Sequence, residues 1–253
     1  MKVLVSKATS QPPAQDMARV SVVLPAYNEE RRVAQVVRRA LEIGAGRVVC
    51  VNDGSHDSTG AILDGLPADP RMEALHHPVN RGKQAAVKTG LRAALAHPDV
   101  SVIALVDADM QNDPAILPGL VPLIGPYDMV IGVRNRGDMP PQRRLANSLA
   151  NLPYRLLAGI PISDVQSGCR LYRRPVAECL IQNLTDTGRY TLEHTTMLLF
   201  GKLACQWRRD FRIAEVEVTY TYEGAVSSIR VRDNMQLTWA AIYHALALAR
   251  LRS

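Results

Sequence analysis

Aromatic residues are scarce in this 253-residue chain: Phe, Trp and Tyr together make up 5%. A surface on which the bases of single-stranded nucleic acid stack needs several such side chains, so the composition argues against nucleic acid as a partner. Cysteine is equally rare. The four cysteines form no CxxC pair, which argues against both a zinc site and a disulfide framework. We therefore expect a reducing, cytoplasmic setting.

Long apolar runs are also missing. No segment approaches the ~20 apolar residues that a membrane-spanning helix needs. Residues 1–18 start with a short apolar stretch and then become polar and proline-rich, so we predict a flexible tail here instead of a signal peptide. The formal net charge of +6 points to an anionic partner such as a nucleotide or a phospholipid surface.

Apolar runs alternate with helical patterns through the first half of the chain. We predict strands at residues 19–26, 47–52, 72–76, 102–106 and 129–133. This alternation indicates βαβ units, hence an α/β fold with a mainly parallel sheet and helices on both faces.

The second half has a different rhythm. We predict a Pro/Arg-rich loop at 139–144 and a helix over 145–157 with four leucines on one face. Next come a polar loop leading into a strand over 164–172, helices near 175–182 and 192–202, and a half-exposed strand over 213–222. We expect one domain over residues 19–231, whose character changes after about residue 135. An amphipathic helix follows over 232–253.

The stretch from Val102 to Pro114 reads VIALVDADMQNDP. Its carboxylates follow a buried strand, and open α/β sheets place their ligands at the carboxyl ends of the strands. Asp107, Asp109 and Gln111 offer the oxygen ligands that Mg²⁺ or Mn²⁺ prefers. The alternative is that they cap the helix that starts near Pro114, although Asp113 already fits that position.

Six short motifs, most of them at the end of a predicted strand, together resemble family 2 glycosyltransferases of GT-A fold. The similarity is greatest to the dolichyl-phosphate mannosyltransferase and polyprenyl-phosphate glycosyltransferase group. The motifs are LPAYNEE at 24–30, VNDGSHDST at 51–59, NRGK at 80–83, DADMQ at 107–111, GVR at 132–134 and DVQSGCR at 164–170.

The resemblance implies a metal-dependent, inverting transfer of a hexose from a GDP- or UDP-sugar, with Mg²⁺ or Mn²⁺ as cofactor. It also implies that residues 19–135 bind the nucleotide sugar and that residues 136–231 serve the acceptor. It places Tyr27 against the nucleobase, Glu29 on the ribose and Asp53 on the base edge. It assigns the metal to Asp107, Asp109 and Gln111. The full nucleotide-sugar set comprises Pro25, Ala26, Tyr27, Glu29, Val51, Asn52, Asp53, Lys83, Asp107, Ala108, Asp109 and Arg134.

The acceptor determines what the second half must do. A hydroxyl acceptor needs a general base, for which Asp164 and Glu193 are the candidates. A polyprenyl phosphate is already ionised and needs only positioning by cations. The candidates for this positioning, in addition to Arg134, are Arg143, Arg144, Arg170 and Arg230.

The chain departs from the family pattern at two places. The first acidic residue of the Asp-Asp-Gly-Ser motif is Asn52 here, which keeps a hydrogen-bonding oxygen but loses a charge. The arginine and the Gly-x-Ser-Lys that follow the last strand in the lipid-phosphate group have no counterpart in register at residues 221–228. This second departure keeps a soluble hydroxyl acceptor as the first alternative.

Two other functions remain as hypotheses: a sugar nucleotidyltransferase and a non-catalytic basic binding module. The C-terminal helix, which ends in Arg250 and Arg252, either packs on the core or contacts a membrane surface or a membrane-anchored partner. We expect a cytoplasmic protein that is peripheral at the membrane face.

Overall fold

One eight-stranded sheet organises the fold. The structure, a computed structural model, describes residues 2–10, 17–184 and 192–221, together with residues 242, 243, 246, 247 and 250. The strands lie in the order β1-β8-β6-β7-β5-β2-β3-β4. Their bounds are β1 Val3–Ala8, β2 Val20–Ala26, β3 Arg47–Asn52, β4 Met72–His76, β5 Val102–Val106, β6 Met129–Arg134, β7 Cys169–Arg173 and β8 Phe211–Val218.

The sheet is mainly parallel, as predicted. Strands β2, β3, β4 and β5 pair in parallel, as do β1, β8 and β6. Strand β7 lies antiparallel between β5 and β6. A strand from the second half, predicted for residues 136–231, is therefore inserted between two strands of the half predicted for residues 19–135.

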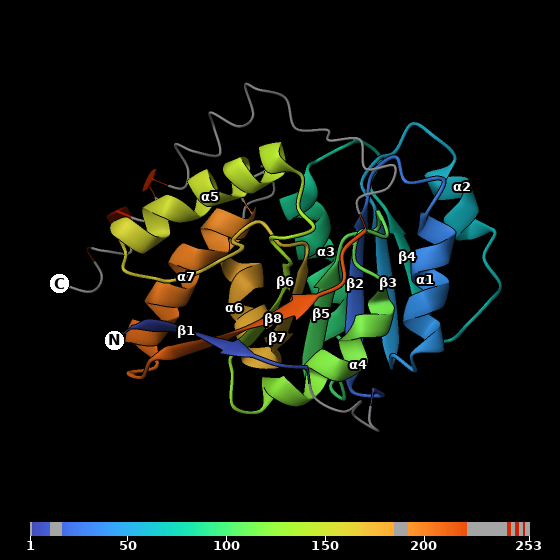
Figure 1. The fold of residues 1–253 in the computed structure, drawn as a ribbon. Coiled ribbons are helices and arrows are strands. Elements are labelled where there is room, and N and C mark those ends of the chain that lie inside the picture. The colour runs from blue at the N-terminus through green and yellow to red at the C-terminus, as the bar shows by residue number, and fades with distance from the viewer. Residues whose placement is uncertain are drawn as a thin grey trace.

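Helices cover both faces. They are α1 Val33–Glu42, α2 Thr59–Asp64, α3 Lys83–Leu95, α4 Leu117–Leu120, α5 Pro141–Leu156, α6 Arg174–Asn183 and α7 Leu192–Gln206, with 3-10 turns at Pro114–Ile116 and Val121–Ile124. Residues of α1 and α4 share one apolar core with one side of the sheet, and residues of α3, α6 and α7 share a second core with the other. Figure 1 shows α1 and α2 toward the β4 end of the sheet, and α5, α6 and α7 toward the β1 end. None of the helices in the described part of the chain has the length and apolar character needed to cross a bilayer.

The predicted tail is wrong for residues 3–8, which form β1 at the sheet edge. This strand pairs in register with β8 from Val3 opposite Phe211 to Ala8 opposite Val216. It also explains why β8 is not the half-exposed strand predicted for 213–222. With β1 on one side and β6 on the other, β8 is an interior strand, and even Glu215 is fully buried. Glu215 accepts hydrogen bonds from Lys7 Nζ at 2.6 Å and from the Ser163 amide at 2.7 Å.

Helix α5 begins at Pro141, inside the segment predicted as a Pro/Arg-rich loop. Proline is well suited to the first turn of a helix, where its missing N–H has no partner to lose. The predicted C-terminal helix at 232–253 falls outside the described residues, apart from five positions.

Candidate active site

The polar motifs after β2, β3 and β5 meet at the carboxyl edge of the sheet, because these strands are neighbours and parallel. Tyr27 follows β2, Asn52 ends β3 and Asp107 follows β5. Asp113, in contrast, caps the turn that starts at Pro114 and accepts the Ala115 amide at 2.8 Å. Asp113 therefore supplies the cap of this turn, whereas Asp109 Oδ1 accepts the Gln111 amide at 3.0 Å and Asp107 contacts Lys83.

Three carboxylates crowd this edge. Burial, and next the charge of Asp109, raise the pKa of Glu29 to about 7. Burial and the charge of Asp107 raise the pKa of Asp109 to about 6. Carboxylates whose ionised forms destabilise one another are characteristic of a site that receives a cation.

Lys83 is the cation closest to this cluster. It begins α3, and its Nζ donates to Asp107 Oδ2 at 3.0 Å and to Glu193 Oε1 at 3.1 Å. Burial by itself would lower the pKa of Lys83, but the charges of Asp107 and Glu193 outweigh it and raise that pKa. Lys83 therefore stays protonated and joins α3, β5 and the first turn of α7.

The residues present fit a divalent ion bound mainly through Asp107 and Asp109. Oδ1 of Asp107 is buried and accepts no hydrogen bond, although it lies 2.8 Å from Lys83 Nζ. Within the described ranges, no three His, Cys, Asp or Glu side chains gather closely enough to hold an ion alone. Mg²⁺ is commonly bound by one or two carboxylates, with substrate phosphates and water completing its shell. An ion held here would therefore need ligands from outside the described residues to complete its shell.

Gln111, the third predicted metal ligand, forms a hydrogen bond with another side chain. Its Oε1 accepts a hydrogen bond from the Tyr220 hydroxyl. The ring of Tyr220 in turn lies 5.5 Å from the Arg134 guanidinium. Sequence reasoning missed Tyr220, which follows β8 and contacts both Gln111 and Arg134.

Gly168 is the second residue that sequence reasoning missed. A Cβ at this position would lie 2.2 Å from Asp107 Oδ2. The glycine of the SGC segment therefore makes room for the carboxylate of Asp107. Its position before an antiparallel strand could be found from the sequence, but its nearness to Asp107 could not.

Asp53 is buried, and Oδ1 lies 2.7 Å from His77 Nδ1 and accepts the Arg81 amide at 3.0 Å. Oδ2 accepts the Gly82 amide at 2.8 Å. Asp53 thus holds the loop that leads into Lys83, and its role at the base edge stays a prediction. His77, which sequence reasoning also missed, continues this series of hydrogen bonds, because its Nε2 lies 2.9 Å from the Thr89 hydroxyl.

Other predicted nucleotide-pocket residues divide between surface and core. Tyr27 is exposed, and its ring meets His56 edge-on at 6.3 Å. Asn52 accepts the Ser55 amide at 3.0 Å, and its amide nitrogen lies 3.1 Å from His76 Nδ1. Pro25 is partly buried, while Ala26 and Ala108 are buried. Val51 is fully buried in the core between β2 and β4, so its side chain forms no part of a pocket wall.

Arg134 and Asp164 form a paired unit. Nε of Arg134 donates to Oδ2 at 2.8 Å and Nη2 donates to Oδ1 at 2.6 Å, while Asp164 is buried. Glu193 is paired as well. Burial alone would raise the pKa of Glu193, but the charges of Lys83 and Arg170 lower it. Both predicted general bases are therefore held by cations.

The guanidinium of Arg170 is buried and donates to the Ser167 and Val165 carbonyls and to the Thr196 hydroxyl, and its role at the acceptor stays a prediction. Arg143 and Arg144 lie in the first turn of α5, partly buried and exposed respectively. Arg144 donates to the Met139 carbonyl at 3.2 Å. The prediction for Arg230 lies outside the described residues.

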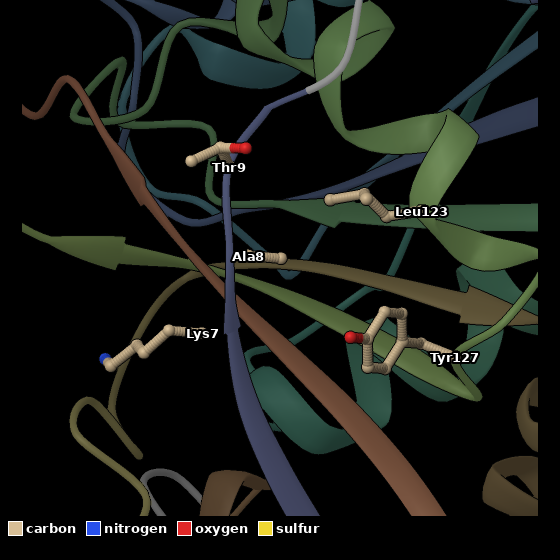
Figure 2. Close-up of a pocket in the computed structure, with 5 residues that line it drawn as sticks. All are labelled: Lys7, Ala8, Thr9, Leu123 and Tyr127. Atoms are coloured by element: carbon tan, nitrogen blue, oxygen red, sulfur yellow. The ribbon is translucent and has the colours of Figure 1, made fainter.

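A separate cavity of about 510 Å³ is lined by Lys7, Ala8, Thr9, Leu123 and Tyr127 (Figure 2). Lys7 extends away from Leu123 and Tyr127, and its Nζ is bound to Glu215. The cavity lacks carboxylates and contains none of the motif residues. The chemistry belongs to the carboxyl edge of the sheet instead.

Comparison with known proteins identifies the family. The sequence profile described as glycosyl transferase family 2 matches residues 21–181, more than half of the chain. The chain belongs to glycosyl transferase family 2. Membership in this family leaves no support for the nucleotidyltransferase and binding-module hypotheses.

Two relatives carry names that mention polyprenyl compounds. Polyprenol monophosphomannose synthase of Mycolicibacterium smegmatis is 30% identical over 215 residues, covering 80% of this chain and 77% of the relative. Undecaprenyl-phosphate 4-deoxy-4-formamido-L-arabinose transferase of Pectobacterium atrosepticum is 31% identical over 175 residues, covering 66% of this chain and 52% of the relative. The present chain therefore spans about half the length of the second relative.

A solved structure has the same fold. Glucosyl-3-phosphoglycerate synthase from Mycobacterium tuberculosis, in complex with Mn²⁺ and UDP-glucose, superimposes with a TM-score of 0.67 at 17% identity. The match covers 98% of this chain and 87% of that one. The predicted GT-A architecture, an α/β fold around a mainly parallel sheet, is thus confirmed.

Proposed function

We propose that this protein transfers a hexose from a GDP- or UDP-sugar to a polyprenyl phosphate, at the cytoplasmic face of a membrane and with Mg²⁺ or Mn²⁺. The observation that carries the proposal is the carboxylate cluster of Glu29, Asp107 and Asp109 at the carboxyl edge of the sheet. Burial and mutual repulsion raise the pKa of Glu29 and of Asp109, and a bound cation would relieve that repulsion, which supports the proposal. The names of the two relatives support the choice of acceptor.

The donor would lie across the ends of β2, β3 and β5. Tyr27 is exposed beside His56 and presents a ring face for a nucleobase. Asp107 and Asp109 would hold the divalent ion, which when bound neutralises the charge that develops on the departing nucleoside diphosphate. Lys83, fixed by Asp107 and Glu193, adds a permanent positive charge beside that position.

The pairing of both candidate bases favours an acceptor that is already ionised. A general base works best when its pKa lies near the working pH and its lone pair is free. Asp164 is engaged by two guanidinium hydrogen bonds, and the pKa of Glu193 is lowered. A phosphate oxygen needs no deprotonation, so it would attack the anomeric carbon directly while the diphosphate leaves from the opposite side.

The second candidate is the same transfer to a soluble hydroxyl acceptor. It is favoured by the missing Gly-x-Ser-Lys motif after β8. For this reaction Arg134 would have to release Asp164, so that the carboxylate could take the hydroxyl proton.

The test is a screen of GDP- and UDP-hexoses with Mn²⁺, in which nucleoside diphosphate release is measured with no acceptor, with polyprenyl phosphate and with polyprenol. We expect release to rise with polyprenyl phosphate and not with the alcohol. Asp109→Asn should lower metal-dependent release by a hundredfold or more, as loss of a group that stabilises transition-state charge does. Asp113→Asn, which keeps the oxygen that caps the turn at Pro114, is the matched control and should retain activity.

Three results would count against the proposal. Full activity in Asp109→Asn would remove the carboxylate cluster from the mechanism. Stimulation by polyprenol equal to that by its phosphate would favour the hydroxyl acceptor. No release with any donor would contradict the assigned transfer.

A further inference from the structure

Helix α5 exposes a row of large apolar side chains. Leu145 is 63% exposed, Leu149 51%, Leu152 44% and Leu156 72%. We call these four residues the leucine stripe. With Leu157, the segment holds five of the ten large hydrophobic side chains that are exposed in the described part of the chain. An exposed apolar surface of this kind marks an interaction site.

The leucine stripe lies opposite the buried face of the helix. At 100° per residue, its four members fall within about 60° of one another. The buried residues of α5 are Asn147, Ala150, Asn151, Pro153 and Tyr154, most of which project to the other side. The amphipathic helix is therefore inverted, with asparagines turned inward and leucines turned outward.

The inward face holds α5 rigidly to the site. Asn151 donates to Asn147 Oδ1 at 2.7 Å and to the Ser163 carbonyl at 2.6 Å, and it accepts the Val165 amide at 2.9 Å. These bonds fix the loop that carries Asp164, the partner of Arg134. The leucine stripe is thus presented by a helix that is anchored beside the acceptor half of the site.

The charged residues of α5 itself are all arginines. Residues 139–163 contain three arginines and no Asp or Glu. Arg144 and Arg155 lie eleven residues apart, so both fall on the same flank of the stripe, and both are exposed. An outward apolar row with arginines on its flank is complementary to an anionic lipid surface, into which such a helix sinks in the plane of the headgroups.

We propose that α5 docks this protein on an anionic phospholipid bilayer through the leucine stripe, with Arg144 and Arg155 at the headgroups. The proposal rests on the proposed function, because a polyprenyl phosphate is itself held in a bilayer with its phosphate at headgroup level. Docking through α5 would place that phosphate on the side of the fold that carries Arg143, Asp164 and Arg134. Figure 1 shows α5 along the outside of the molecule, away from β3 and β4.

The test is sedimentation of the full chain with vesicles of phosphatidylcholine alone and of phosphatidylcholine mixed with phosphatidylglycerol. We expect binding to the anionic vesicles. The double substitution Leu149→Gln, Leu152→Gln should weaken it tenfold or more, because two large apolar side chains lose their burial in lipid. Arg155→Gln should weaken it about fivefold, the effect of one cation near an anionic surface. Leu4→Gln on β1 and Arg38→Gln on α1 are matched controls, and both should bind as the wild type does.

Donor hydrolysis without vesicles separates this proposal from the proposed function. In the double leucine variant we expect that hydrolysis to be unchanged, while transfer to vesicle-embedded polyprenyl phosphate falls with binding. A wild-type protein that hydrolyses donor but binds no vesicles would overturn docking and leave the function intact. An inactive wild type that still binds vesicles would overturn the function alone.

Two further outcomes would assign the stripe to another occupant and overturn docking. If the double variant leaves vesicle binding unchanged but lowers the melting temperature of a monomer, a segment of the same chain covers the leucines. If the wild type is a dimer and the variant is a monomer by light scattering, a second copy covers them.

Discussion

At the scale of single residues, the site depends on how much space each carboxylate has. Asp107 is confined by Lys83 on one side and by the backbone of Gly168 on the other. Asp53 and Arg170 differ from Asp107 because buried hydrogen bonds within the protein occupy their side chains. A polar residue in a motif therefore becomes a site residue only if the packing around it leaves an atom free to bind.

Gly168→Ala tests this spatial constraint. The added methyl group would lie within 2.2 Å of Asp107 Oδ2, so the carboxylate must rotate away from Lys83 and from the metal position. We expect Mn²⁺-dependent donor hydrolysis and Mn²⁺ affinity to fall about tenfold to a hundredfold, as when a group that orients a metal ligand is lost. Kinetics and calorimetric titration with Mn²⁺ and nucleoside diphosphate measure these quantities.

Gly125→Ala is the matched control, because a Cβ there meets no atom within 4 Å. Wild-type Mn²⁺ affinity in Gly168→Ala would show that Asp107 is not held in place by the neighbouring backbone.

At the scale of elements, buried ion pairs join strands that are distant in the sequence. Asp128 precedes β6, is buried, and accepts hydrogen bonds from Arg209 after α7 and from the Arg212 amide in β8, the latter at 2.9 Å. Arg173 at the end of β7 lies 3.5 Å away. Burial alone would raise the pKa of Asp128, but the hydrogen bonds from Arg209 and Arg212 outweigh it and lower that pKa.

A lowered carboxyl pKa has a defined effect on stability. Asp128 stabilises the fold above the pKa of the unfolded chain, about 4, and this contribution is lost as the pH falls below that value. We expect Asp128→Asn to lower the free energy of unfolding by about 1–3 kcal/mol near neutral pH, and by less near pH 3.

Urea denaturation at both pH values measures the difference between Asp128→Asn and the wild type. Asp99→Asn, at an exposed loop position before β5, is a control that should change little at either pH. A gap between Asp128→Asn and wild type that stays constant with pH would contradict the role of the ionised carboxylate.

At the scale of the whole molecule, charge is distributed unevenly. The chain carries a net charge of +6, yet Glu29, Asp107 and Asp109 converge on one edge of the sheet. The arginines of α5 lie on another part of the surface. An acidic cluster that binds a cation and a basic helix that binds an anionic surface are compatible because they lie on different elements.

The acidic cluster should make the metal-free protein less stable as the pH rises. The folded-state pKa values, about 7 for Glu29 and about 6 for Asp109, lie above the ordinary carboxyl range. Between about pH 4.5 and pH 7 the folded state therefore binds more protons than the unfolded state, and stability falls with rising pH. We expect Mn²⁺ to raise the melting temperature more near pH 7 than near pH 5, since it binds the ionised carboxylates.

Thermal unfolding with and without Mn²⁺ tests this pH dependence. Glu29→Gln should reduce the slope of the metal-free melting temperature with pH, and Glu42→Gln on the exposed end of α1 should not. A metal effect that is equal at both pH values would show that the ion binds elsewhere.

The sequence by itself determined the strands β2 to β7, the helices between them and the positions of the motifs. These features depend on local patterns: apolar runs, helix caps such as Asp113, and polar residues where a run ends. Because the strands are parallel and adjacent, the order of the motifs was enough to bring Tyr27, Asn52 and Asp107 to one edge. The family match at residues 21–181 confirms the resemblance drawn from them.

Only the tertiary structure decided which of these residues face the site and which elements are covered. Residues 3–8 became a strand because β8, more than 200 positions away, offered an edge to pair with. Asp53 turned inward because the amides of Arg81 and Gly82 bind it there, and Arg170 donates inward to the distant Thr196 hydroxyl. The stripe of α5 turned outward because Asn147 and Asn151 found partners inside. Each outcome depends on a contact between distant parts of the chain, and local sequence patterns do not specify such contacts.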